Sequence, residues 1–113
     1  MFLPVEIWDL SSLDVKPSQP EVLSSDQEGR AIVINLPAGE SLQEHQVHER
    51  AWLVVLSGSV EVDDSDGNCT SGSTGLLSVF DPNERHEVRA TEDARLLLLL
   101  SPWPGEGHPR NRD

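Results

Sequence analysis

Short apolar runs rich in Val, Ile and Leu alternate with clusters of Gly, Pro, Asn, Asp and Ser along most of the chain. Apolar residues with helical spacing are almost absent. The pattern predicts strands over residues 5–10, 30–36, 51–56, 59–62, 74–80, 86–90 and 94–100. Many short strands separated by turns are typical of an all-β sandwich or barrel.

Two gaps between these strands are short enough to indicate tight turns. Ser57-Gly58 lies between two apolar runs and predicts a hairpin. Residues 91–93 have a similar place between the last two strands. The leucine run 96–100 that follows is too short to cross a bilayer and indicates a buried strand.

The length of 113 residues fits one domain with one core. We expect an N-terminal strand and connection over residues 1–29, a barrel core over 30–100 and a Pro/Gly-rich tail over 101–113. Residues 11–28 are rich in Ser, Pro and acids, which favours a surface connection. The tail either trails into solvent or folds back with Trp103 packed on the barrel.

The net charge of −12 excludes whole classes of partner. A phosphate backbone needs clustered Lys and Arg, so we expect no nucleic acid partner. The same repulsion argues against anionic membrane surfaces. The N-terminal sequence carries two acids and no positive region, which does not favour a secretory signal, so we expect a cytoplasmic protein.

The polar loop of residues 63–75 offers two candidate chemistries, and both are weak. Cys69 is the only cysteine and has no basic neighbour in sequence to lower its pKa, which argues against a nucleophilic role. Aligning Gly67 with the turn glycine of a calcium loop puts Val62 and Ser73 where acidic ligands are needed. The loop is therefore interpreted as a solvated turn.

Three of the four histidines lie in two short blocks, residues 39–58 and 75–86. In the first block, Gly39 is followed by five residues and His45, and Gly58 ends the block. In the second block, Gly75 begins the segment that ends at His86. This spacing resembles the paired motifs of the cupin superfamily over residues 31–100, which implies an all-β fold: a single small jelly-roll β-barrel.

The departures from the cupin pattern decide which ligands carry over. The family places a second histidine where this chain has Val47 and a glutamate where it has Ala51. Only His45 and His86 therefore match ligand positions. Asn83 and Ala90 replace a glycine and an asparagine of the second motif.

Nearby residues offer a replacement ligand set. A bulge at Gln46-Val47 would bring His48 to the side of His45, whereas strict alternation favours Glu49 or Gln43. We therefore predict a metal site of His45, His48 and His86, with Glu49 as a further candidate and Zn, Fe, Ni or Mn as the metal. The alternative is that both His45 and His48 are surface residues and His86 is a hydrogen-bonded strand residue. His108, in the tail, is the weakest candidate.

The resemblance implies a metal-binding cupin with a small organic ligand inside the barrel. An enzyme of this kind would be a metal-dependent dioxygenase, isomerase or decarboxylase, but the sequence identifies no catalytic acid–base pair. The competing hypothesis is a non-catalytic binding or sensing module with a vestigial or absent metal site. The resemblance also implies a homodimer, in which the apolar segment 2–10 is the natural pairing element.

Overall fold

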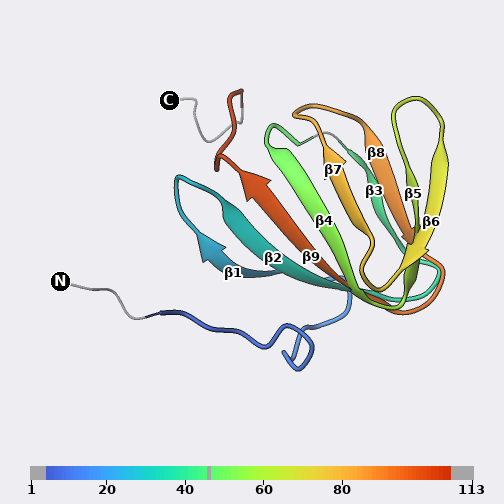
Figure 1. Cartoon of the computed structure of the whole chain (residues 1–113), viewed down its shortest axis with the longest axis horizontal. Helices are drawn as coiled ribbons and strands as arrows, with labels where there is room; N and C mark the ends of the chain where they lie inside the picture. Colours follow the sequence, from blue (N-terminus) through green and yellow to red (C-terminus); the bar gives the residue numbers. More distant parts are fainter. Residues whose placement is uncertain (1–4, 46, 108–113) are drawn as a thin grey trace.

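The computed structural model describes residues 5–45 and 47–107, without the side chains of residues 43–45. Nine strands lie in this described part (Figure 1): β1 Glu21–Ser25, β2 Arg30–Leu36, β3 Ser41–His45, β4 Arg50–Ser57, β5 Ser59–Asp63, β6 Cys69–Ser73, β7 Leu77–Phe80, β8 His86–Ala90 and β9 Ala94–Ser101. The described residues contain no helix, and therefore none long and apolar enough to span a membrane.

Two antiparallel sheets face each other. One has the strand order β1-β2-β9-β4-β7 and the other β3-β8-β5-β6. Strands that follow each other in sequence repeatedly lie in different sheets, which is the jelly-roll arrangement. The predicted all-β jelly-roll fold is confirmed.

The core lies between the sheets and comes from alternate positions of the strands. In β4, Ala51, Leu53 and Val55 are buried, whereas the residues between them are half-buried on the outer face. In β9, Leu96 and Leu100 point into the same core. Because side chains alternate across a strand, the leucine run contributes to both faces of its sheet.

Ser57-Gly58 is a crossing between sheets, and the hairpin prediction there is wrong. β4 belongs to the five-stranded sheet and β5 to the four-stranded sheet. The link 91–93 between β8 and β9 is a second crossing of the same kind. A Cβ atom at Gly58 would lie 2.1 Å from the Asp93 carbonyl oxygen, so the two crossings touch and only glycine fits. The pairing of distant strands, which a local pattern does not report, decides this geometry.

The predicted N-terminal strand over residues 5–10 is also wrong. Those residues pair with no strand in the described part of the chain, and Val5 and Ile7 are 83% and 84% exposed. The edge strand next to β2 is β1, which the sequence assigned to a connection. Asp26 makes this pairing possible, since its carboxylate accepts hydrogen bonds from the Glu28 and Gly29 amides in the β1–β2 turn. The sequence also missed β3 and β6.

The N-terminal connection is held against the barrel by polar side chains of the outer face. Asn35 donates its Nδ2 hydrogen bond to the Val15 carbonyl at 2.6 Å, and Arg95 donates to the Leu10 carbonyl at 2.8 Å. Val15 itself is buried. Residues 10–18 are therefore part of the domain rather than a free linker.

The described part of the C-terminal tail folds back onto the barrel, which selects the second of the two alternatives left open above. Trp103 packs against the core cluster, and the Arg30 guanidinium carbon lies 3.9 Å from the centre of its ring. The Trp103 amide also donates to the Gln27 carbonyl. In Figure 1 the tail lies beyond the end of β9 and the start of β4. This is the end of the barrel where β3 ends and β8 begins, and we call it the mouth.

Candidate functional site

His86 begins β8 with its side chain directed into the barrel. It is 5% exposed, and its ring stacks on Phe80 with centroids 3.9 Å apart and planes inclined by 13°. The His86 Nδ1 lies 3.2 Å from the Glu84 carbonyl oxygen. Because a carbonyl can only accept a hydrogen bond, Nδ1 is the donor in this contact.

His45 occupies the position opposite His86 in the ladder between β3 and β8. Directly opposed positions of an antiparallel pair lie on the same face of a sheet. A register shift separates Leu42 from His45, so this end of β3 is irregular. The side chains of His45 and Gln43 lie outside the described residues, as does all of His108.

His48 and Glu49 lie in the turn between β3 and β4, against the C-terminal tail. His48 is half-buried, and its Nδ1 lies 3.5 Å from where a Cβ atom of Gly107 would be. Glu49 is 1% exposed, and its Oε2 accepts a hydrogen bond from the Gly105 amide at 2.6 Å. Both side chains that the sequence offered as replacement ligands therefore contact or approach the tail.

A cavity of about 10 Å³ lies inside the barrel at this end, which is room for about one water molecule. The described residues of its lining are apolar except for His86: Leu42, Val47, Ala51, Leu53, Phe80, His86, Val88, Leu98 and Leu100. Val47 and Ala51, which replace the family's second histidine and its glutamate, both face this cavity. Among the residues whose side chains the structure describes, no group of three or more His, Cys, Asp and Glu could hold a metal ion.

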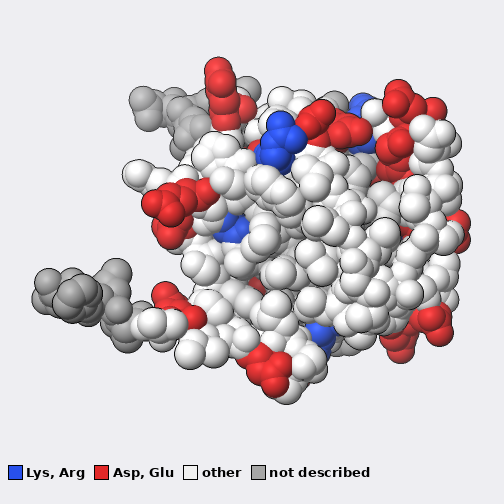
Figure 2. Space-filling model, viewed as in Figure 1, with Lys and Arg blue, Asp and Glu red and all other residues white. Residues whose placement is uncertain are grey.

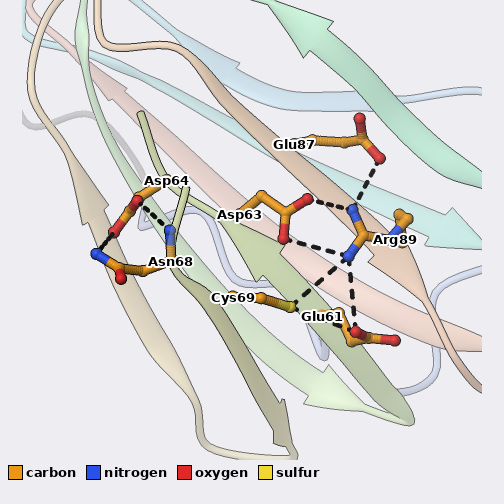
Figure 3. Close-up of polar contacts among 7 residues, drawn as sticks. All are labelled: Glu61, Asp63, Asp64, Asn68, Cys69, Glu87 and Arg89. Carbon is orange, nitrogen blue, oxygen red and sulfur yellow. Dashed lines mark hydrogen bonds and ion pairs between the residues drawn. The ribbon is translucent and has the colours of Figure 1, made fainter. Parts of the chain in front are cut away.

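A second polar cluster, which the sequence did not predict, surrounds Arg89 on the outer face of the four-stranded sheet (Figure 3). Its guanidinium donates to Asp63 and to Glu87, the latter at 3.0 Å, and forms an ion pair with Glu61 at 3.6 Å. The hydrogen bonds from Arg89 hold the pKa of Asp63 below its usual value, and those to Asp63 and Glu87 raise the pKa of Arg89. These residues alternate along paired strands β5 and β8, and the pairing of those two strands was the missing signal.

Cys69 lies at the edge of this cluster. Its thiol donates to Glu61 at 3.3 Å and accepts from Arg89 at 3.7 Å, so a basic residue is close in space although none is close in sequence. Hydrogen bonds to the carboxylates of Asp63 and Glu61 raise the pKa of the thiol to about 11. The thiol is therefore protonated at pH 7, which argues against a nucleophilic role.

The acidic loop after β5 is a turn closed by its own carboxylate. Asp64 Oδ1 accepts hydrogen bonds from the amides of Asp66 and Asn68, each at 2.9 Å. The Asn68 amide is the main cause of the lowered pKa of Asp64. This arrangement agrees with the interpretation as a solvated turn.

Comparisons with known proteins agree with this fold. The family model of the cupin domain matches residues 32–102. A comparison with curated proteins gives no match.

Solved structures resemble the whole domain. A conserved protein of unknown function from Streptococcus pyogenes is 20% identical, with a TM-score of 0.73 over 88% of this chain and 90% of that one. An uncharacterised protein with a double-stranded β-helix domain from Klebsiella pneumoniae is 17% identical, with a TM-score of 0.75 over 88% and 91%. KdgF from Halomonas sp. is 25% identical, with a TM-score of 0.69 over 80% and 85%. The matches extend over most of each chain, and at these identities they describe the fold.

Proposed function

This chain belongs to the cupin domain family, and we propose that it is a small metal-binding member that holds one divalent transition metal at the mouth of its barrel. The ligands in this proposal are His45, His48 and His86. Zn, Fe, Ni and Mn all suit imidazole ligands, and three protein ligands leave room for water or a substrate. When bound, the metal would supply a Lewis acid or an oxygen-activating centre.

The observation that carries the proposal is the fixed orientation of the His86 ring. A metal-binding histidine usually donates its second ring nitrogen to a carbonyl or carboxylate, which fixes the ring and leaves the other nitrogen to the metal. His86 has this arrangement, since Nδ1 is directed at the Glu84 carbonyl and Phe80 fixes the ring plane. The position of His45 directly opposite in the ladder supports a shared site.

The small interior cavity limits where an organic ligand could lie. At about 10 Å³, the space behind His86 takes no more than about one water. We therefore infer that a small organic ligand would approach the metal from the mouth of the barrel. A dioxygenase, an isomerase and a decarboxylase remain the enzyme classes to test.

Elemental analysis of the purified, untagged protein tests this function. We expect about one transition metal per chain, and we expect metal-free protein to gain thermal stability from Zn, Ni, Mn or Fe. At a free metal concentration one hundred times the Kd, the gain is about 2.7 kcal/mol. Protein that retains no metal and gains no stability would contradict the proposal.

The second candidate is a metal-free module that binds or senses a small molecule. The specific observation in its favour is that Val47 and Ala51 line the cavity where the family has ligands. This candidate predicts that no metal stabilises the protein but that an organic ligand does. The same thermal experiment therefore separates the two functions.

We also propose that two copies of the chain associate through the outer face of the five-stranded sheet. Figure 2 shows a wide uncharged area over β9, β4 and β7, with carboxylates around it. Trp52, Val54, Leu77 and Leu99 contribute to a groove of about 520 Å³ on this face, where Leu77 is 57% exposed. The groove is also lined by Asp26, Glu28 and Arg30, but the apolar part of the face lets two copies approach although each carries −12, and the exposed Val5 and Ile7 offer further apolar contact.

Sedimentation tests this association. We expect twice the chain mass for the natural protein and the chain mass for Leu77→Glu, with unchanged circular dichroism. Thr70→Glu, at an exposed position of the other sheet, is the matched control and should remain dimeric. A natural protein that sediments as a monomer at micromolar concentration would contradict the proposal.

A further inference from the structure

We propose that the segment from Pro102 to Gly107 is a latch that covers the β3–β4 turn at the mouth of the barrel, and that Glu49 is the residue that anchors it. The consequence for metal entry rests on the proposed function, but the latch itself does not. The argument has three parts, which are the anchor, the steric fit of the tail, and its second attachment.

The anchor is a buried carboxylate that depends on the tail for a hydrogen bond. Glu49 is 1% exposed, and its Oε2 lies 2.6 Å from the Gly105 amide nitrogen. Losing a hydrogen-bond donor is costly for a carboxylate for as long as the group stays buried. Hydrogen bonds to charged groups are also the stronger ones. The contact therefore holds the tail in place and keeps Glu49 in a defined position.

The tail approaches the turn between β3 and β4 more closely than any residue but glycine allows. A Cβ atom at position 105 would lie 2.4 Å from the His48 carbonyl oxygen and 3.0 Å from the Glu49 amide nitrogen. Gly105 is itself buried. Because the obstacles are backbone atoms, a side chain here would displace the tail rather than be accommodated.

The second attachment joins the tail to the β1–β2 turn. Trp103 packs on the core beneath Arg30, and its amide donates to Gln27 in the β1–β2 turn. The tail is thus fixed to one turn through Trp103 and to another through Gly105. The tail therefore bridges these two turns, with the His48 backbone against Gly105 and the His48 ring close to Gly107.

The latch and the proposed metal site share the residues of one turn. His48 is a proposed ligand, and the next residue, Glu49, holds the tail. A tail that closes over both the empty and the loaded site slows metal entry and release equally and leaves the affinity unchanged. The geometry therefore assigns Glu49 to the tail rather than to the metal.

Hydrogen exchange of the metal-free protein tests the latch without reference to any metal. We expect the amides of Trp103 and Gly105 to be protected in the natural protein, and both Glu49→Ala and Gly105→Ala to reduce that protection about 10- to 100-fold. Ser71→Ala, at an exposed position of β6 in the four-stranded sheet, is the control. Equal exchange in the natural protein and both variants would overturn the latch, whatever the metal result.

Stopped-flow mixing with Zn²⁺ then tests the gate. If the latch controls entry, Gly105→Ala and Glu49→Ala both raise the rates of zinc uptake and release about 10-fold or more, with Kd unchanged within about threefold. A Kd that weakens in Glu49→Ala but not in Gly105→Ala would identify Glu49 as a ligand and overturn its role as an anchor only. Natural protein that takes up no zinc but shows the exchange result would contradict the proposed function and not the latch.

Discussion

The two sides of the barrel mouth come from the two histidine-containing blocks of the chain, and they are organised differently. On the β8 side, His86 is buried, stacked on Phe80 and oriented by the Glu84 carbonyl. On the side of the β3–β4 turn, Val47 and Ala51 are apolar and face the cavity, while Glu49 binds the tail. The comparison teaches that His86 is held by packing and a backbone carbonyl, whereas the β3–β4 side, which carries the proposed ligands His45 and His48, is held by its contact with the tail.

Removing His86 should have the largest effect, because it removes both a proposed ligand and a buried ring. We expect His86→Ala to abolish metal retention and to lower the free energy of unfolding by about 1–3 kcal/mol, since it empties a buried position beside Phe80. Elemental analysis and urea unfolding measure the two effects. His108→Ala is the control, and a loss of metal in that variant would contradict the three-histidine set.

Restoring a ligand on the apolar side should reduce the difference between the two sides. Val47 faces the same cavity as His86, so we expect Val47→His to tighten zinc binding about tenfold, which corresponds to about 1.4 kcal/mol. Calorimetric titration measures the change. Val47→Leu, which keeps the position apolar, is the control. An affinity that does not rise would mean that the cavity cannot bring the two imidazoles together.

Loosening the tail from its second attachment should have a moderate effect. We expect Trp103→Ala to lower the free energy of unfolding by about 1–2 kcal/mol, because it removes apolar burial and the contact with the Arg30 guanidinium. Arg30→Met removes the cation and its exposed hydrogen bond to Ser25 but leaves the Trp103 packing, and should cost about 0.5 kcal/mol. Urea unfolding compares the two variants, and a larger loss in Arg30→Met than in Trp103→Ala would contradict this account of the tail.

The smallest effect should come from the Arg89 cluster, which lies outside the mouth. Arg89 lowers the pKa of Asp63, so this contact stabilises the fold above the unfolded pKa of Asp and ceases to do so as the pH falls through the lowered value. We therefore expect Arg89→Met to lower the melting temperature slightly at pH 7 but not at about pH 2. Arg50→Met breaks one exposed ion pair, with Asp81, and should lower the melting temperature even less. A melting difference between natural protein and Arg89→Met that is equal at both pH values would exclude the ion pair as its cause.

The sequence predicted the elements that form from local patterns. Residues 30–36 and 86–90 form strands with the predicted bounds, since β-branched and apolar residues in short runs carry that signal by themselves. The spacing that leads from Gly75 to His86 likewise placed His86 in the barrel. The cupin resemblance therefore identified the fold and one buried histidine.

What the sequence did not predict depends on contacts between distant segments. Gly58 lies in a crossing between sheets, where it packs against Asp93. The carboxylate of Glu49 accepts a hydrogen bond from Gly105, which is 56 residues away in the sequence. Residues 5–10 have the pattern of a strand but lack a partner in the described part of the chain, so the apolar pattern alone misassigned them. Both strand pairing and the contact between Glu49 and the tail depend on tertiary structure.

X-ray absorption at the zinc edge tests the difference between the two sides most directly. On natural protein loaded with one equivalent of zinc, we expect the scattering pattern of imidazole ligands, with Zn–N distances of about 2.0–2.1 Å. The same pattern should persist in Glu49→Ala, whose anchor is lost while its ligands remain. Zinc bound without imidazole scattering, or an oxygen ligand that disappears in Glu49→Ala, would contradict the assignment of His86 to the metal and Glu49 to the tail.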